Sequence, residues 1–276
     1  MNKKLITLAV AGALASPMFA VAADAPASPH TFTGNMTFAT EYLYRGIAQT
    51  RGKPALQGGF DYAHSSGLYA GIWGSNISWI NDGTPGASAS LEVDIYGGYK
   101  GAITDDIGFD VGVLTYNYPG SDKTPTGWIK PDTTEVYGAL SWKWLTLKYS
   151  HSTTPLFGWY NPVSGKKSRG SGYLELNAAY DLGDGWGING HVGHQTVRNY
   201  SDASYTDYKI GVTKDVGFGV VGAAYSTTNA NDSCGAIAVA AATDGNNPYC
   251  FSKQSGGQDT YNAGKGRLVV TFGKTF

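Results

Sequence analysis

The sequence predicts an all-β fold, a transmembrane antiparallel up-and-down β-barrel of about twelve strands with short periplasmic turns and long extracellular loops. Three observations predict it. The chain begins with an export signal, apolar and polar residues alternate along nearly all of it, and its connections alternate between short and long.

The first residues have the pattern of a secretory signal. Lys3 and Lys4 precede a short apolar run at 5–15, and the small residues at 20–23 offer a cleavage site. The run is too short for a spanning helix. We therefore expect a cleaved signal peptide at residues 1–23, a flexible leader rich in Ala and Pro at 24–30, and one barrel domain at 31–276.

Composition favours strands over helices. The chain has 39 Gly, 19 Tyr and 7 Trp, but only 15% charged residues. The net charge of -1 and the lack of a basic cluster argue against a nucleic-acid partner. The mean hydropathy is -0.22, and no run after residue 30 reaches the ~18 apolar residues of a membrane helix.

Period-two alternation marks the strands. In the first segment Phe32, Met36 and Phe38 alternate with Thr33 and Thr37. About twelve segments of this kind are near the ~9–11 residues that a tilted strand needs to cross a bilayer. They lie at 31–44, 54–64, 67–79, 90–100, 106–118, 133–142, 144–153, 171–181, 186–197, 205–214, 217–228 and 266–276.

The boundary between the expected strands 133–142 and 144–153 contains neither Gly nor Pro. The apolar parity changes from even to odd near Lys143 and Trp144, and a one-residue slip would exchange the two faces of a strand. We therefore expect a tight turn there. Four more short turns are expected at 64–66, 101–105, 183–185 and 215–216, and longer loops at 45–53, 80–89, 119–132, 154–170, 198–204 and 229–265.

Soluble sandwiches and lipocalin-like barrels also have alternating strands, and alternation alone does not tell which face is inside. The sorting of connections by length and the export signal favour the outer-membrane barrel. The last strand agrees with this, because the chain resembles outer-membrane barrels in ending on an amphipathic strand with a terminal Phe. That resemblance implies recognition by the barrel-assembly machinery through Leu268, Val270, Phe272 and Phe276, although Lys274 departs from the pattern.

The N-terminal third carries a more specific resemblance. Three sequences resemble the opening of the TorF family of porins: Tyr-x-Tyr-Arg-Gly at 42–46, Pro-Ala-Leu-Gln-Gly-Gly-Phe-Asp-Tyr at 54–62, and Gly-Leu-Tyr-Ala-Gly-x-Trp at 67–73. The segment 91–99 and the last ten residues also fit. The resemblance implies a pore in the outer membrane of a Gram-negative bacterium, without a substrate.

If the apolar faces meet lipid, charged residues of the polar faces line the lumen. Acidic residues predominate, which indicates a mild cation preference unless the charges pair and close the barrel. Glu41 and Arg45 are expected at the outer rim of the first strand, where the pair could shape the entrance. The expected pore-lining residues are Glu41, Arg45, Asp61, Glu92, Asp94, Asp110, Glu135, Lys148, Glu175, Asp207, Lys209 and Arg267.

Aromatic residues near segment ends predict two girdles. The extracellular girdle would contain Tyr42, Tyr44, Trp79, Tyr116, Tyr118 and Trp159. The periplasmic girdle would contain Trp142, Trp144, Trp186, Phe218 and Phe276.

Cys234 and Cys250 both fall in the longest loop, and an even number of cysteines in an exported chain favours a disulfide over free thiols. The Ala-rich run at 235–243 would lie inside that loop, either folded inward as a constriction or at the rim.

No catalytic, metal or cofactor motif is supported. Gly217–Gly222 matches GxGxxG but lacks the strand before and the helix after. Three functions stay open: a diffusion channel for small hydrophilic solutes, a closed barrel that recognises partners through its loops, and a lipid hydrolase using His151. The solute, the gating and any homo-oligomer are not specified.

Overall fold

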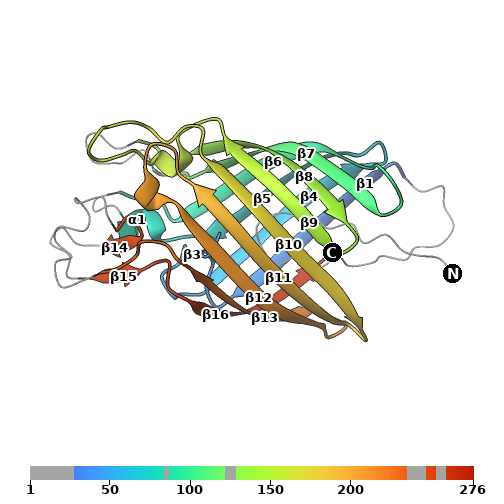
Figure 1. Ribbon diagram of the computed structural model, residues 1–276. Coiled ribbons are helices and arrows are strands. Elements are labelled where there is room, and N and C mark those ends of the chain that lie inside the picture. Colours follow the sequence, from blue (N-terminus) through green and yellow to red (C-terminus); the bar gives the residue numbers. More distant parts are fainter. Residues whose placement is uncertain (1–27, 84–86, 122–128, 235–246, 253–258) are drawn as a thin grey trace.

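The computed structural model describes residues 28–83, 87–121, 129–234, 247–252 and 259–276. The expected signal peptide and all but the end of the expected leader lie outside the described residues, as does the Ala-rich run at 235–243. The described chain forms one closed antiparallel barrel (Figure 1).

Twelve strands form the wall, in the order β1-β16-β13-β12-β11-β10-β9-β8-β7-β6-β5-β4. Each expected segment corresponds to one of them, so the predicted fold is confirmed. The strands are β1 (His30–Ala39), β4 (Ala55–His64), β5 (Leu68–Asn76), β6 (Leu91–Ala102), β7 (Ile107–Asn117), β8 (Thr133–Trp142), β9 (Leu145–Ser152), β10 (Gly172–Gly183), β11 (Trp186–Thr196), β12 (Tyr205–Asp215), β13 (Val220–Thr228) and β16 (Arg267–Thr275).

The last residue helps to close the barrel. β1 pairs with β16 in a register that matches Asn35 with Thr275. Beyond that pair, the Phe276 amide donates to the Gly34 carbonyl at 2.8 Å, and the Gly34 amide donates to the Phe276 carbonyl at 2.9 Å. A Cβ at Gly34 would lie 3.1 Å from the Phe276 ring, so the ring packs directly on the glycine.

Connections sort by length between the two ends of the barrel, as predicted. The tight turn at Lys143 and Trp144 is confirmed, because Trp142 pairs with Leu145 and Lys143 has a φ of 54°. The long connections hold α1 (Trp79–Gly83), η1 (Leu156–Gly158), η2 (Ser201–Ala203) and the two small hairpins β2 (Leu43–Tyr44) with β3 (Ile47–Ala48) and β14 (Cys250–Ser252) with β15 (Thr260–Asn262). In Figure 1 the labelled α1, β14 and β15 lie together at the long-loop end.

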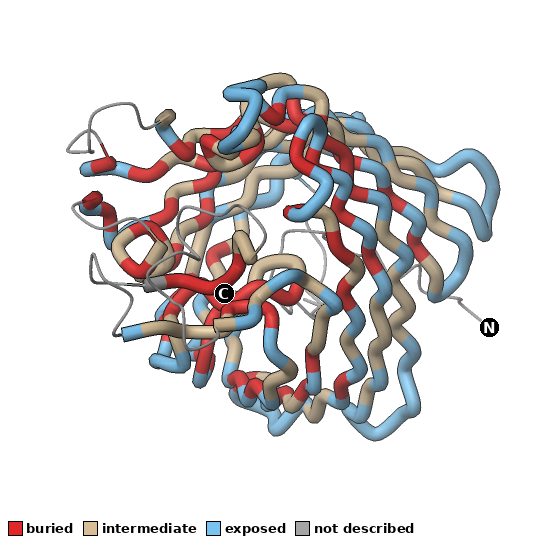
Figure 2. Tube along the Cα trace, turned by 60° about the vertical axis from the view of Figure 1, so that its left-hand side comes forward, coloured by how far each residue is buried: buried red, intermediate tan, exposed pale blue. Residues whose placement is uncertain are grey.

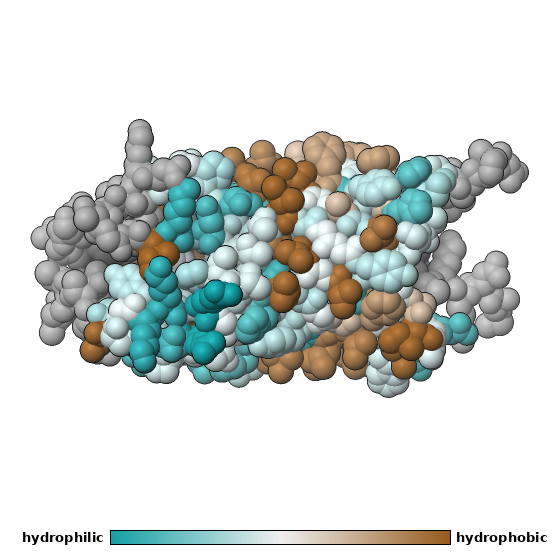
Figure 3. Space-filling model, turned by 90° about the horizontal axis from the view of Figure 1, so that it is seen from above, coloured by the Kyte–Doolittle hydropathy of each residue, from teal (hydrophilic) through white to brown (hydrophobic). Residues whose placement is uncertain are grey.

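The two faces of the wall differ in polarity. Large apolar side chains such as Phe38, Ile72, Leu140 and Ile210 are exposed on the outside. Figure 3 shows hydrophobic side chains along the barrel wall and hydrophilic ones toward the long-loop end. In Figure 2 buried and exposed residues alternate along the strands. No helix among the described residues is long and apolar enough to cross a membrane.

The first strand is shorter than expected. We predicted 31–44, but β1 ends at Ala39, and Leu43 and Tyr44 instead pair with Ala48 and Ile47 in a separate hairpin. Alternation continues through this break, because a hairpin strand has the same period of two as a barrel strand. Parity alone therefore could not locate the end of β1.

Deleting Phe276 should lower the free energy of unfolding of the refolded chain by about 1–3 kcal/mol, because two backbone hydrogen bonds at the closure are lost. Phe276→Leu keeps both bonds and is the matched control. Urea titration in detergent micelles measures the difference. Equal stability of the deletion and the control would show that closure does not depend on this residue.

Candidate functional site: a hairpin across the barrel lumen

The candidate site is built around the β2–β3 hairpin, residues 43–48, which we call the lumen hairpin. Its two-residue turn is Arg45-Gly46, and both residues have positive φ, 47° and 77°. Positive φ at both turn positions is the type I′ geometry that suits the twist of a two-stranded hairpin. A Cβ at Gly46 would lie 2.5 Å from Thr228 Cγ2, so only glycine fits against the wall there.

The turn places Arg45 against the wall opposite β1. Its Nη2 lies 2.7 Å from Glu135 Oε2 on β8, and its Nη1 donates to Glu135 Oε1 at 3.1 Å and to Gln195 Oε1 on β11 at 2.6 Å. The guanidinium also lies 4.1 Å from the ring centre of Tyr173 on β10. Because β8, β10 and β11 lie far from β1 around the barrel, the lumen hairpin crosses the lumen.

This ion pair is shielded from water. The Arg45 side chain is 8% exposed and that of Glu135 is 3% exposed. Tyr116 also donates to Glu135 at 3.4 Å, and Tyr44 donates to Tyr116 at 2.8 Å. A buried bidentate pair of this kind holds a planar geometry, and removing one partner leaves an uncompensated charge.

The base of the lumen hairpin is fastened to neighbouring loops. The Gln49 amide donates to the Tyr42 carbonyl at 2.8 Å, and the Ala48 amide donates to the Ala263 carbonyl beside β15 at 2.9 Å. Glu41 accepts from the Gly52 amide at 2.7 Å and from the Tyr261 hydroxyl at 2.6 Å. The lumen hairpin is therefore part of the hydrogen-bonded structure at the mouth.

Two carboxylates on β6 face the lumen beside the hairpin. Glu92 is buried and accepts from the Tyr42 hydroxyl at 2.6 Å. Asp94 is also buried, and its Oδ1 has no hydrogen-bond partner among the described residues. Two acidic side chains therefore lie together on the lumen wall beside the hairpin.

A second group of charges lies on β9 to β12. His191 lies between the two carboxylates of this group, with its Nε2 2.9 Å from Asp207 Oδ1 and its Nδ1 3.7 Å from Glu175 Oε2. The Lys148 ammonium lies 4.3 Å from the ring centre of Tyr137. Neither Lys148 nor Lys209 forms an ion pair within the described part of the chain.

Tyrosines hold the remaining carboxylates of the wall. Tyr96 and Asn35 both donate to Asp61, the second at 3.1 Å. Tyr69 donates to Asp110 at 2.6 Å. The barrel interior therefore alternates charged groups with aromatic hydroxyls.

The expected pore-lining residues divide into three groups by position. Asp61, Glu92, Asp94, Asp110, Glu135, Lys148, Glu175, Asp207, Lys209 and Arg267 are on wall strands, and none of them is fully exposed. Arg45 is on the lumen hairpin, and Glu41 is in the segment before it. The expectation that Arg45 sits at the outer rim of the first strand is wrong, because the chain turns inward after Ala39, whereas Glu41 stays at the mouth against Gly52 and Tyr261.

The prediction of an extracellular aromatic girdle is also wrong. Tyr42, Tyr116 and Tyr118 are buried, and they pack inside the mouth with partly buried Tyr44 and Trp79. Trp159 packs against Tyr249 of the loop before β14. By contrast, all five expected periplasmic residues are exposed on the outside near the short turns, namely Trp142, Trp144, Trp186, Phe218 and Phe276.

The longest connection is cross-linked. Cys234 and Cys250 form a disulfide that ties the segment after β13 to the start of β14. Tyr249, next to Cys250, donates its hydroxyl to the Ala203 carbonyl of η2 at 2.6 Å. Its backbone carbonyl accepts from the Ala263 amide at 3.0 Å.

His151 of β9 has few contacts. Its side chain lies on the outer parity, and its ring Nδ1 lies 3.4 Å from the Tyr149 hydroxyl. The neighbouring Ser150 and Ser152 are buried on the opposite face. A hydrolytic triad would need the histidine to reach both a nucleophile and an orienting acid.

Sequence reasoning missed the lumen hairpin. The local signal is the dipeptide Arg45-Gly46, which is flanked by short apolar pairs. It is a weak signal, because type I′ turns favour Asn or Asp before the glycine. The interaction that fixes the hairpin connects residues 90 positions apart, and nothing local to the turn predicts it.

Comparison with known proteins agrees with this architecture. A family model described as "Bacterial protein of unknown function (Gcw_chp)" matches residues 23–274. No curated protein matches the chain.

Among solved structures, the KdgM porin aligns with a TM-score of 0.51 and 6% identity, over 88% of this chain and 99% of that one. The KdgM porin in complex with disordered oligogalacturonate gives 0.50 and 6%, over 89% and 99%. The NanC porin gives 0.47 and 10%, over 89% and 98%. At these identities the likeness to KdgM shows the fold alone.

Gly46→Ala should destabilise the protein by about 2–5 kcal/mol, because it adds a methyl group against Thr228 to the strain of positive φ. Gly217→Ala is the matched control. Its φ is 90°, but no atom lies within 4 Å of the added Cβ, so only backbone strain applies. Urea titration of both variants checks this, and equal losses would contradict the tight seating of the hairpin.

Proposed function

The chain belongs to the Gcw_chp family of bacterial proteins, and we propose that it is an outer-membrane channel for the passive diffusion of small hydrophilic solutes. The observation that carries the proposal is a closed barrel whose outer face is apolar and whose inner face carries charged side chains. This arrangement is the reverse of a soluble barrel with an apolar core.

The outer face supports a position in the membrane. Ile210 is 62% exposed and Leu140 is 54% exposed at mid-strand positions, where water would be a poor solvent for them. In this proposal the outer-membrane lipid covers these side chains, and the short turns face the periplasm. The same proposal includes the resemblance of residues 42–73 to the TorF family of porins. It also includes insertion by the barrel-assembly machinery through the C-terminal strand, and association of copies of the chain into a homo-oligomer.

The inner face supports conduction of ions and polar solutes. Acidic side chains outnumber basic ones among the inward residues, and Asp94 has an unpaired oxygen. Rings of charge at close quarters select solutes by field and size. We therefore expect a mild preference for cations and no enzymatic activity.

One observation favours a second function. The lumen hairpin fills part of the cross-section and its Arg45–Glu135 pair is nearly closed to water. A barrel that stays closed would act through its loops, as a structural or surface-recognition protein. A channel conducts ions across a bilayer, whereas a closed barrel does not, so conductance distinguishes the two functions.

The experiment is single-channel recording of the refolded mature chain in a planar bilayer. The wild-type protein should give discrete steps. Arg45→Ser combined with Glu135→Ser should raise the step size by about twofold or more, because two large side chains are removed from the lumen and no buried charge is left unpaired. Lys53→Ser, on the exposed loop after the hairpin, should leave the steps unchanged.

A folded wild-type barrel without steps, together with steps in the double variant, would favour the closed barrel. Absence of steps in both would contradict the channel altogether. Arg45→Ser alone should lower stability by about 3–5 kcal/mol, since Glu135 is then left buried and unpaired.

Asp94→Asn should reduce the cation preference, because it removes a lumen charge that is unpaired among the described residues. Asp105→Asn, in an exposed short turn, is the matched control. The measurement is the reversal potential in a salt gradient. A reversal potential that is the same for wild type and Asp94→Asn would exclude Asp94 from the conduction path.

A further inference from the structure

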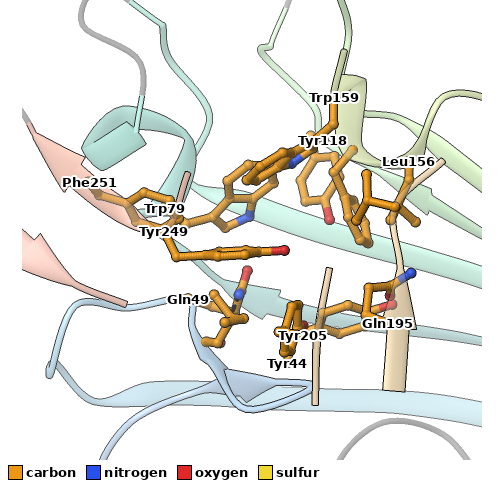
Figure 4. Close-up of a pocket in the computed structure, with 13 residues that line it drawn as sticks. Tyr44, Gln49, Trp79, Tyr118, Leu156, Trp159, Gln195, Tyr205, Tyr249 and Phe251 are labelled. Atoms are coloured by element: carbon orange, nitrogen blue, oxygen red, sulfur yellow. Dashed lines mark hydrogen bonds between the residues drawn. The ribbon is translucent and has the colours of Figure 1, made fainter. Parts of the chain in front are cut away.

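A pocket with about 500 Å³ of empty space, part of it open solvent, lies on the long-loop side of the lumen hairpin (Figure 4). Its lining comes from many parts of the chain: the lumen hairpin, α1, η1, and the loop before β14. The aromatic members that matter here are Trp79, Tyr118, Phe157, Trp159, Tyr249 and Phe251.

The aromatic walls are held in place before any ligand arrives. Trp79 meets Tyr118 edge to face, with ring centres 5.4 Å apart at 85°. Trp159 lies 5.1 Å from Tyr249. Phe157 has a φ of 49°, an uncommon conformation for a bulky residue, and its amide donates to Thr133 Oγ1 at 2.7 Å. The backbone is thus fixed in the conformation that aims the Phe157 ring at Tyr116 and Trp79.

One polar group in this pocket lacks a partner. Trp79 Nε1 is buried, and it donates to no acceptor among the described residues. A buried N–H without an acceptor costs free energy, and buried indoles usually find one. Two other polar side chains of the lining are engaged. Gln195 accepts from Arg45 and donates to the Gly172 carbonyl, and Tyr249 donates to the Ala203 carbonyl.

We propose that this pocket binds a small, uncharged, planar aromatic molecule that carries a hydrogen-bond acceptor, with the acceptor on Trp79 Nε1 and the ring between the side chains of the mouth. Each part of this class follows from the lining. The rings supply stacking surfaces. The lining residues carry no formal charge, which disfavours an ionised ligand.

This proposal does not depend on conduction. A barrel that passes no ions can bind such a molecule, and a conducting barrel can lack the site. Binding is therefore measured on the refolded mature chain in detergent micelles, without a bilayer or a potential.

The probes are methyl benzoate, which has a carbonyl acceptor, and ethylbenzene, which has none. Isothermal titration is run on wild type, Trp79→Phe, Val197→Phe and the matched control Trp144→Phe, which is exposed near the short turns. Trp79→Phe keeps an aromatic ring and removes the N–H. Val197→Phe adds volume to the pocket wall. Partition of each probe into micelles is the same for all variants and cancels in the comparison.

Methyl benzoate should bind wild type and Trp144→Phe equally, and about three- to tenfold more weakly to Trp79→Phe. Ethylbenzene should bind wild type and Trp79→Phe alike, and neither probe should bind Val197→Phe. The proposal is overturned by absence of saturable binding to wild type, or by equal binding of methyl benzoate to wild type and Trp79→Phe. It is also overturned by binding that survives Val197→Phe. Retention of the wild-type gel mobility shift on heating identifies variants that are folded.

Discussion

Closure of the hydrogen-bond ladder between β1 and β16 is the constraint on which the rest of the structure depends. A sheet with a free edge would leave a row of unpaired amides and carbonyls, which an apolar surrounding cannot solvate. The twelve-strand order removes that edge, and the exchange of two hydrogen bonds between Gly34 and Phe276 continues the pairing to the last residue. Once the ladder is closed, every side chain must point either out or in. The alternation in sequence then becomes a difference between an apolar wall and a polar lumen.

A polar lumen creates a second requirement, since its carboxylates lose water as the space fills. The protein meets it mostly with tyrosines rather than with basic residues. Tyr42 donates to Glu92, Tyr69 to Asp110, and Tyr173 to Asp207 at 2.8 Å. A hydroxyl satisfies a carboxylate without cancelling its charge. The interior therefore keeps a negative excess while most of its carboxylates stay bonded, and arginines pair with two of them, Arg45 with Glu135 and Arg267 with Glu41.

The wall could be predicted from the sequence because its rule is local. Alternation along 133–153 placed the parity change, and the turn at Lys143 followed from it. The mouth could not be predicted in the same way. Tyr42 and Tyr116 have the pattern of interface aromatics, and only the inward fold of 40–54 makes them core residues. The Arg45–Glu135 contact joins two segments that are 90 residues apart, and nothing local to either segment predicts it, so the sequence predicts Arg45 at the rim rather than in the lumen.

The lumen hairpin and the aromatic pocket share parts, and this links the two halves of the mouth. Tyr44 lines the pocket and its ring centre lies 4.9 Å from the Arg45 guanidinium, while Gln195 lines the pocket and accepts from the same guanidinium. A molecule in the pocket would touch the residues that hold Arg45 against Glu135. By linkage, it can shift the hairpin only to the extent that it binds one hairpin position better than another. Ring contacts to Tyr44 supply such a difference, because Tyr44 moves with the hairpin whereas Trp79 and Trp159 belong to other loops. Coupling between the pocket and the lumen hairpin would pass through the shared residues, Tyr44 and Ile47 of the hairpin and Gln195, which accepts from Arg45.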